Sequence, residues 1–339
     1  MVMSIEGGRV DRQIALAVRA EMLVMAASPL FNGNTEMAGL IDNRGTVLFN
    51  QTYDPEKWKI AADACKEAIE ACHGAGKKLY TEIEPITVTQ PPVLQLQTML
   101  RQVVCERWNC ELIWGGTNSQ CRDRSYHSTP RVVRIDAGII NTISAQWAPT
   151  IKTVESFYTS NGVPMNEDKQ WSKEGWYDKR HELRSEPSSG DEKYFVKEGQ
   201  RTCYMHYNRE PRFYAWIGFD RGDYPCNGIT NLKLRAGERN GAEWANGAAN
   251  LGRDLIYGGY AIAKGIHPDA KMTATQRSIV SYPYILARLG ELYLNYAEAY
   301  VEYYGKLDGK ALEYINAIRN RAGIPNMETS YAKIGGLPT

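Results

Sequence analysis

The stretch LARLGELYLNYAEAYVE, residues 286–302, constrains the fold more than any other part of the sequence. Its leucines, tyrosines and alanines recur at helical spacing, which predicts one broad buried face opposite a charged, solvated side. That face comprises Leu286, Leu289, Tyr293, Tyr296, Ala297, Tyr300 and Val301. A second helix is predicted to begin at the N-cap Asp308 and to end at Gly323 and Pro325. The short connection between the two predicts an antiparallel helical hairpin.

Two further helices are predicted near the N-terminus. Residues 14–27 are rich in helix-forming residues, and Asp54 followed by Pro55 suits the start of another helix. The mixture of small and large residues is typical of tetratricopeptide-like pairs, in which alanines let neighbouring helices approach closely. One such pair cannot bury its own apolar face, so several must pack together. We therefore interpret the tyrosines of 286–302 as packing residues, with ligand binding as the alternative.

The bulk composition is that of a globular protein without a charge bias. Apolar residues make up 43% of the chain, and 40 Lys and Arg face 39 Asp and Glu, for a net charge of +1. This balance argues against binding to nucleic acid or to an anionic membrane surface. No apolar run reaches the roughly 18 residues that a transmembrane helix needs. The N-terminal stretch MVMSIEGGRVDRQ has no apolar signal-peptide core, and the first cysteine is Cys65.

The cysteines and histidines form no pattern that predicts a metal or cofactor site. The sequence holds seven cysteines and no C-x-x-C motif, and its five histidines are scattered. Cys65 and Cys72 fall on the apolar face of a predicted helix, which favours buried free thiols. We expect no metal and no cofactor.

The middle of the chain, from about Leu79 to Met272, has little helical periodicity and much Gly, Asn, Trp and Tyr. Loops are therefore expected to dominate there. Short helices are predicted over residues 95–107 and 148–158. The runs 111–114 and 212–219 are rich in β-favouring and aromatic residues and predict strands.

Six segments, read in order along the chain, resemble the SusD/RagB family of surface glycan-binding lipoproteins of Bacteroidetes. Each motif alone is weak, but a series that spans nearly the whole chain is specific. The segments are AASPLFNGN (26–34), YDPEKWKIAADACKEAIE (53–70), ESFYTSNGVPM (155–165), NREPRFYAWIGF (208–219), YPYILARLGELYLNYAEAYVE (282–302) and ALEYINAIRNRAGIP (311–325).

The resemblance implies a mainly α fold of tetratricopeptide-like helical pairs, with a long irregular region and a few short β-strands. A single, incomplete SusD-like domain would span residues 1–339. Its helical scaffold would comprise 12–78 and 282–323, and its loop-rich ligand-binding region 79–281. Family members carry further segments before "SPLFNG" and after "RAGIP", so this chain is expected to be truncated at both ends.

In function, the resemblance implies surface binding of an oligosaccharide and its delivery to a SusC-like TonB-dependent outer-membrane transporter. The chain would sit at the cell outer membrane through a lipid anchor that this sequence does not contain. The alternatives are a peptide-binding, RagB-like protein and a generic helical-repeat interaction protein. No catalytic motif such as G-x-S-x-G or H-E-x-x-H occurs, and no pair of acidic residues stands out, so we expect no enzymatic activity.

Sugar binding requires flat aromatic faces for the pyranose rings and polar groups for their hydroxyls. Two loops supply this mixture, 113–128 and 166–182, and we favour the first because it precedes the ESFYTSNG segment. The candidate ligand-binding residues are Trp114, Asn118, Arg122, Arg124, Tyr126, Trp147, Trp171 and Trp176. The alternative for each loop tryptophan is that it only covers the scaffold.

Overall fold

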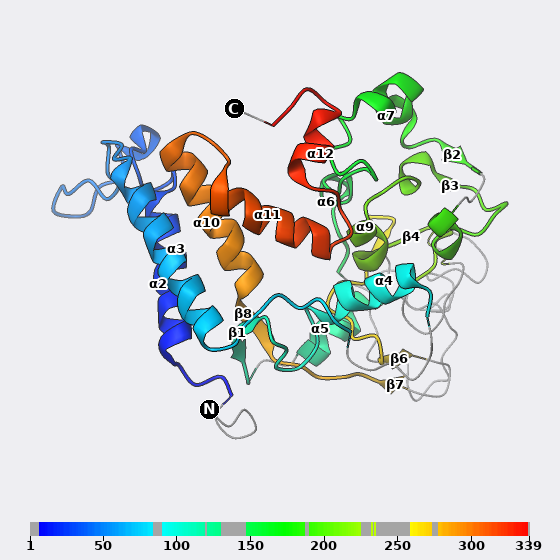
Figure 1. Cartoon of the computed structure of the whole chain (residues 1–339), viewed down its shortest axis with the longest axis horizontal. Helices are drawn as coiled ribbons and strands as arrows, with labels where there is room; N and C mark the ends of the chain where they lie inside the picture. The colour runs from blue at the N-terminus through cyan, green and yellow to red at the C-terminus, as the bar shows by residue number, and fades with distance from the viewer. Residues whose placement is uncertain are drawn as a thin grey trace.

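The computed structural model confirms the predicted fold class, because helices dominate and the strands are short. It describes residues 7–83, 90–118, 121–129, 147–186, 190–224, 232, 234, 258–272 and 277–337. Four long helices gather on one side, and a loop-rich region of short helices and strands lies on the other (Figure 1). None of the described helices combines the length and the apolar character needed to cross a membrane.

The helical scaffold consists of α2 (Arg12–Ala27), α3 (Glu56–Gly74), α10 (Leu289–Tyr304) and α11 (Gly309–Arg321). Asp11 caps α2, since its carboxylate accepts a hydrogen bond from the Ile14 N–H at 2.9 Å. Helix α3 packs between α2 and α10, and α11 packs against α10. Small residues make this close packing possible, because Ala64 and Ala68 of α3 are fully buried in the shared core.

The tyrosine helix begins later than predicted, at Leu289. Residues 284–288 form strand β8 (Tyr284–Arg288), which pairs antiparallel with β1 (Leu112–Gly116). The predicted buried position Leu286 therefore lies in a strand and is 42% exposed. The prediction for Tyr293 is correct: its ring is buried, stacks on Tyr314 at 4.1 Å between centroids, and its hydroxyl meets His73 Nε2 at 2.6 Å.

Among the described residues, the loop-rich region contains six short α-helices. Its strands form four two-stranded antiparallel pairs, one of which includes β8. The helices are α4 (Pro92–Gln102), α5 (Cys121–Ser128), α6 (Ile151–Glu155), α7 (Lys169–Glu174), α8 (Trp176–Lys179) and α9 (Pro211–Trp216). The pairs are β1–β8, β2–β3, β4–β5 and β6–β7, with strands β2 (Leu183–Arg184), β3 (Thr202–Cys203), β4 (Ile217–Phe219), β5 (Tyr260–Ile262), β6 (Lys271–Met272) and β7 (Arg277–Ser278). A further helix, α12 (Met327–Ala332), follows α11, and 3-10 turns occur at Thr35–Met37, Gly190–Tyr194 and Tyr204–His206.

The aromatic run 212–219 corrects one prediction. Only its end is a strand, β4, and the residues before it form α9. Pro211 occupies the first turn of α9, where its fixed φ and missing N–H favour a helix start. Phe213 is fully buried in a core cluster of aromatic side chains, so tertiary packing overrides the local β preference.

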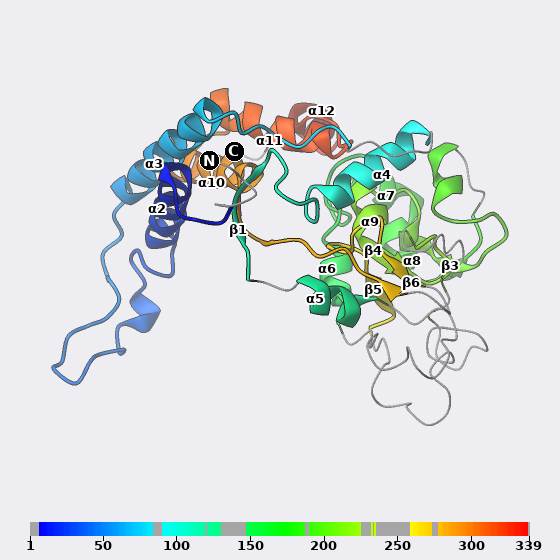
Figure 2. The same ribbon diagram turned by 90° about the horizontal axis from the view of Figure 1, so that it is seen from below.

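The pair β1–β8 joins the two regions (Figure 2). At the start of β1 the carboxylate of Glu111 is buried, and Arg288 Nη1 donates to its Oε1 at 3.1 Å. Its Oε2 accepts hydrogen bonds from Arg321 Nη1 and from the Tyr80 N–H. One carboxylate therefore ties β1 to β8, to the end of α11 and to the segment before α4.

The buried thiols of α3 allow a first prediction. Burial raises the pKa of Cys65 to about 12 and that of Cys72 to about 11. Because alkylation requires the thiolate, both should react with iodoacetamide at pH 8 on the order of a hundredfold more slowly in the native protein than in urea. Mass mapping should show the half-buried Cys203 modified before Cys65 and Cys72. Equal native rates for Cys65 and Cys203 would contradict this packing of α3.

Candidate functional site

Helix α5 presents part of the loop predicted to bind ligand. Arg122 and Tyr126 lie four residues apart, so they share one helix face. Arg122 Nε donates to the Tyr126 hydroxyl at 3.1 Å, and its guanidinium carbon lies 5.4 Å from the centroid of the tyrosine ring. Tyr126 itself is only 7% exposed. The buried tyrosine therefore anchors the helix, and the exposed Arg122 lies over the tyrosine ring.

Trp147 adds an aromatic face next to the end of α5. Its backbone N–H donates to the carbonyl of His127 at 3.1 Å, and the two rings lie 5.5 Å apart with planes tilted by 31°. The side chain is 48% exposed, whereas the other tryptophans that the structure describes are buried or half-buried. The indole therefore offers open surface to a ligand.

The other three predicted residues of this region lie in different surroundings. Asn118 is exposed in the turn that follows β1. The Arg124 guanidinium lies against Gly265, where an added Cβ would come within 3.3 Å of its Cζ. Trp114 is half-buried against the core of α2 and α3, and its Nε1 donates to the Gly8 carbonyl at 3.2 Å. The structure thus gathers Arg122, Tyr126 and Trp147 around α5 and directs Trp114 toward the scaffold.

Trp171 and Trp176, from the second predicted loop, lie in the core. Their side chains are 2% and 5% exposed, and their ring centroids are 5.0 Å apart. Trp176 also stacks on Tyr204 at 3.5 Å. Asp168 caps α7 by accepting from the N–H of Trp171, which holds this indole in place. In this structure both indoles pack against other rings, and their role in ligand binding stays a prediction.

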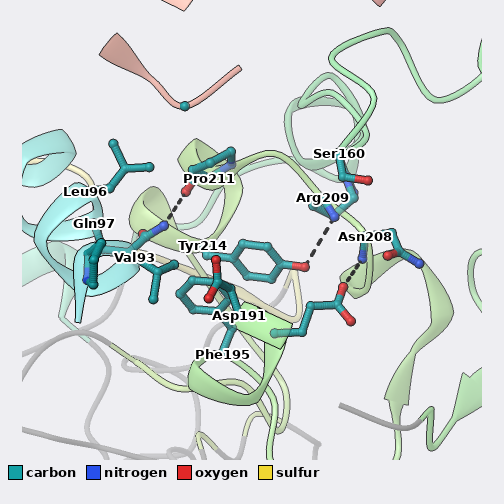
Figure 3. Close-up of a pocket in the computed structure, with 13 residues that line it drawn as sticks. Val93, Leu96, Gln97, Ser160, Asp191, Phe195, Asn208, Arg209, Pro211 and Tyr214 are labelled. Atoms are coloured by element: carbon teal, nitrogen blue, oxygen red, sulfur yellow. Dashed lines mark hydrogen bonds between the residues drawn. The ribbon is translucent and has the colours of Figure 1, made fainter. Parts of the chain in front are cut away.

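A cavity that the sequence did not predict opens between α4 and the segments 191–195 and 208–214. Its volume is about 460 Å³, and its walls include Val93, Leu96, Pro211 and Tyr214 (Figure 3). Gln97 Nε2 donates to the Pro211 carbonyl at 2.9 Å, which ties α4 to the start of α9. No sequence pattern predicts this cavity, because α4 lies about a hundred residues before the other two segments and the three share no motif.

The buried side chain of Arg209 stabilises the backbone around one wall of this cavity. Its guanidinium donates to four backbone carbonyls, those of Val154, Phe157, Tyr158 and Met205. Burial lowers the pKa of Arg209 to about 10, although it remains positively charged at neutral pH. All three guanidinium nitrogens are therefore engaged with the backbone. No group of three or more His, Cys, Asp or Glu residues in the described part of the chain is placed to hold a metal ion.

Comparison with known proteins decides the family. The family model described as SusD family matches residues 110–335, which covers two thirds of the chain. The chain belongs to the SusD family. The resemblance predicted from the six segments is thereby confirmed, and the matched part of this SusD-family chain includes α5, Trp147 and the hairpin α10–α11.

Two solved structures extend the likeness to the N-terminal helices. The structure named BT4246 is 29% identical, with a TM-score of 0.74 over 94% of this chain and 55% of its own. A SusD-like protein from Bacteroides fragilis, BF3747, shares the fold at 17% identity, with a TM-score of 0.53 over 96% of this chain and 49% of its own. The SusD-family chain thus spans about half the length of these structures. No curated protein sequence matches it.

Proposed function

We propose that this SusD-family chain is a non-catalytic glycan-binding protein of a nutrient-uptake system. It would capture an oligosaccharide at the outer-membrane surface and pass it to a SusC-like TonB-dependent transporter. Family membership supports this role in general terms. The observation that carries the location of the site is the half-exposed indole of Trp147 beside α5.

The chemistry around Trp147 suits a sugar. An open indole face provides apolar contact for the C–H face of a pyranose ring, and stacking does not require a particular hydroxyl pattern. The exposed Arg122 and Asn118 would supply hydrogen-bond donors, and Asn118 an acceptor as well, to select among hydroxyl patterns. Because Tyr126 holds Arg122 from beneath, little side-chain entropy would be lost when a sugar hydroxyl accepts from the guanidinium.

Replacing Trp147 with alanine tests this site directly. We expect the affinity for the cognate glycan to fall about tenfold or more, as for other binding sites centred on one tryptophan. The fold should be unaffected, because the bond from Trp147 to His127 uses the backbone N–H, which alanine retains. The measurement is electrophoretic retardation in native gels that contain each of a panel of soluble polysaccharides.

Tyr53→Ala is the matched control. Tyr53 is 53% exposed, and it lies in the loop that extends away from α2 and α3 (Figure 2). It should leave retardation unchanged. Equal losses in both variants, or full retardation of Trp147→Ala, would overturn the proposed site. A folded wild-type chain that no polysaccharide retards would overturn the glycan-binding proposal itself, and peptides would then be tested as ligands.

A further inference from the structure

Two half-buried cations on neighbouring elements have no counter-ion. Lys264 lies in the turn after β5, and its Nζ is 4.4 Å from the centroid of the Trp216 ring. The Arg124 guanidinium of α5 lies against Gly265, the residue that follows Lys264. Among the described residues, no carboxylate forms an ion pair with either cation. Buried charges in proteins are normally paired, so these two cations point to an anionic ligand.

Two further arginines lie around Lys264. Arg212 precedes Trp216 by four residues on α9, so both side chains share one face of that helix. Arg288 is the last residue of β8, directly before α10. Helices α5 and α9 and strand β8 lie on three sides of the junction between the scaffold and the loop-rich region (Figure 1). Burial lowers the pKa of Lys264 to about 8, and the positive charges of three arginines, 288, 124 and 212, add to this effect.

The carboxylates that pair with these arginines are less accessible than the arginines themselves. Glu111 is 1% exposed, whereas the side chain of its partner Arg288 is 24% exposed. Glu210 is also 1% exposed, against 27% for its partner Arg212. Glu291 of α10 is exposed, but its charge acts on the lysine ammonium less strongly than those of the three arginines. A ligand at this junction therefore meets mainly positive charge, although the whole chain has a net charge of only +1.

The cluster also holds hydrogen-bond donors that the described residues leave unused. An ammonium has three N–H donors and a guanidinium has five, and no described residue accepts a hydrogen bond from Lys264 Nζ or from the Arg124 side chain. Arg288 uses only its Nη1 for the Glu111 carboxylate. A carboxylate or a sulfate ester combines negative charge with several acceptor oxygens, so it matches these donors in both charge and geometry.

We propose that this cluster binds the acidic group of a saccharide, either a carboxylate or a sulfate ester. The proposal rests on the proposed glycan-binding function and narrows the ligand to acidic glycans. Lys264 and Arg124 would donate charge-assisted hydrogen bonds to the oxyanion, and Arg288 would add electrostatic attraction. Arg124 lies one helical turn before His127, the residue that contacts Trp147, so a short oligosaccharide can span both places.

The test is titration calorimetry of the full chain with two matched probe pairs. Trigalacturonate and its methyl ester form the first pair, and a sulfated galactan oligosaccharide and its desulfated form are the second. We expect the acidic member of at least one pair to bind about tenfold or more tightly than its neutral partner. The pair that shows this preference identifies the acidic group as a carboxylate or a sulfate ester. A triglutamate peptide, which is acidic but contains no sugar, should bind more weakly than the preferred saccharide.

Lys264→Met locates the site, because methionine keeps an unbranched apolar side chain over Trp216 but removes the ammonium. The affinity for the acidic saccharide should fall about tenfold or more, and Arg124→Gln should have a similar effect. Lys66→Met is the control, since Lys66 is exposed on α3, outside this cluster. The thermal melt of Lys264→Met should not fall below that of the wild type, because burial and three arginines oppose the lysine charge. A purely structural lysine would instead lose stability on substitution.

Equal affinity for the acidic and neutral members of both pairs would overturn this proposal, and retardation by a neutral polysaccharide would then leave the Trp147 site standing. Unchanged affinity in both Lys264→Met and Arg124→Gln, each with a wild-type melt, would also overturn it. Binding of triglutamate as tightly as the acidic saccharides would overturn the assignment to a sugar. A chain that binds neither pair and that no polysaccharide retards would overturn the proposed function together with this inference.

Discussion

Replacing Glu111 with alanine is expected to lower the free energy of unfolding by about 3–5 kcal/mol. The side chain is 1% exposed, and its two oxygens bind Arg288, Arg321 and the Tyr80 N–H. Alanine would leave the guanidinium of Arg321, itself only 6% exposed, without its counter-ion. Removal of one partner from a buried ion pair costs far more than the pair contributes when intact, because the remaining charge cannot be solvated. Domains are stable by only about 5–15 kcal/mol, so most of the margin would be lost.

Glu67→Ala provides the matched comparison, because Glu67 also pairs with an arginine, Arg19, at 2.7 Å. Both partners are about half exposed, so water replaces the lost contact and the cost should be about 0–1 kcal/mol. Urea unfolding, followed by circular dichroism, measures both variants. A Glu111→Ala midpoint close to that of Glu67→Ala would show that the carboxylate does not hold the two regions together.

The contacts of Glu111 could not be predicted from the sequence. Glu111 opened a short β-favouring run and carried no sign of burial. Its partners Arg288 and Arg321 follow 177 and 210 residues later. No periodicity connects residues at such separations, since helix and strand patterns reveal only which face of one element is buried. Those patterns did predict α2, α3, α10 and α11, because the apolar residues within each helix recur at helical spacing.

The start of α10 was misplaced for the same reason. Leu286 continues the helical spacing of Leu289 and Tyr293, so the local pattern includes it. The backbone of 284–288 instead pairs with β1, which lies about 170 residues earlier in the chain. Hydrogen bonds to a distant strand compete with the first helical turn, and the end of a helix is where helical hydrogen bonds are fewest.

Composition nominated the candidate site residues, but it did not predict which of their side chains are exposed. Of the residues predicted in the loop 113–128, Arg122 and Tyr126 lie together on α5, and Trp147 packs against His127 at the end of this helix, whereas Trp114 packs toward the scaffold. Nothing in the sequence distinguished exposed Trp147 from buried Trp171 and Trp176, because all three stand in polar, aperiodic segments. The cavity beside α4 was missed altogether, since its lining residues come from separate segments of the chain.

Trp176→Ala tests the distinction between a packing and a binding tryptophan. We expect it to lower the free energy of unfolding by about 3–5 kcal/mol, the cost of deleting a large buried side chain and leaving a cavity. Trp176 is 5% exposed and lies between Trp171 and Tyr204, so its removal takes a ring contact from both of them. The measurement is the urea midpoint of the variant relative to wild type.

Trp147→Ala is the counterpart in the same assay, since the same residue type is deleted from a site that is 48% exposed. Its free energy of unfolding should stay within about 0.5 kcal/mol of the wild-type value, as for most surface substitutions. The packing role of Trp176 and the binding role of Trp147 would then be distinguished, because one variant loses stability and the other loses glycan retardation. If Trp176→Ala instead folds with wild-type stability and loses retardation, the ring is available to ligand in solution. The packing of Trp176 against Trp171 and Tyr204 would then be wrong.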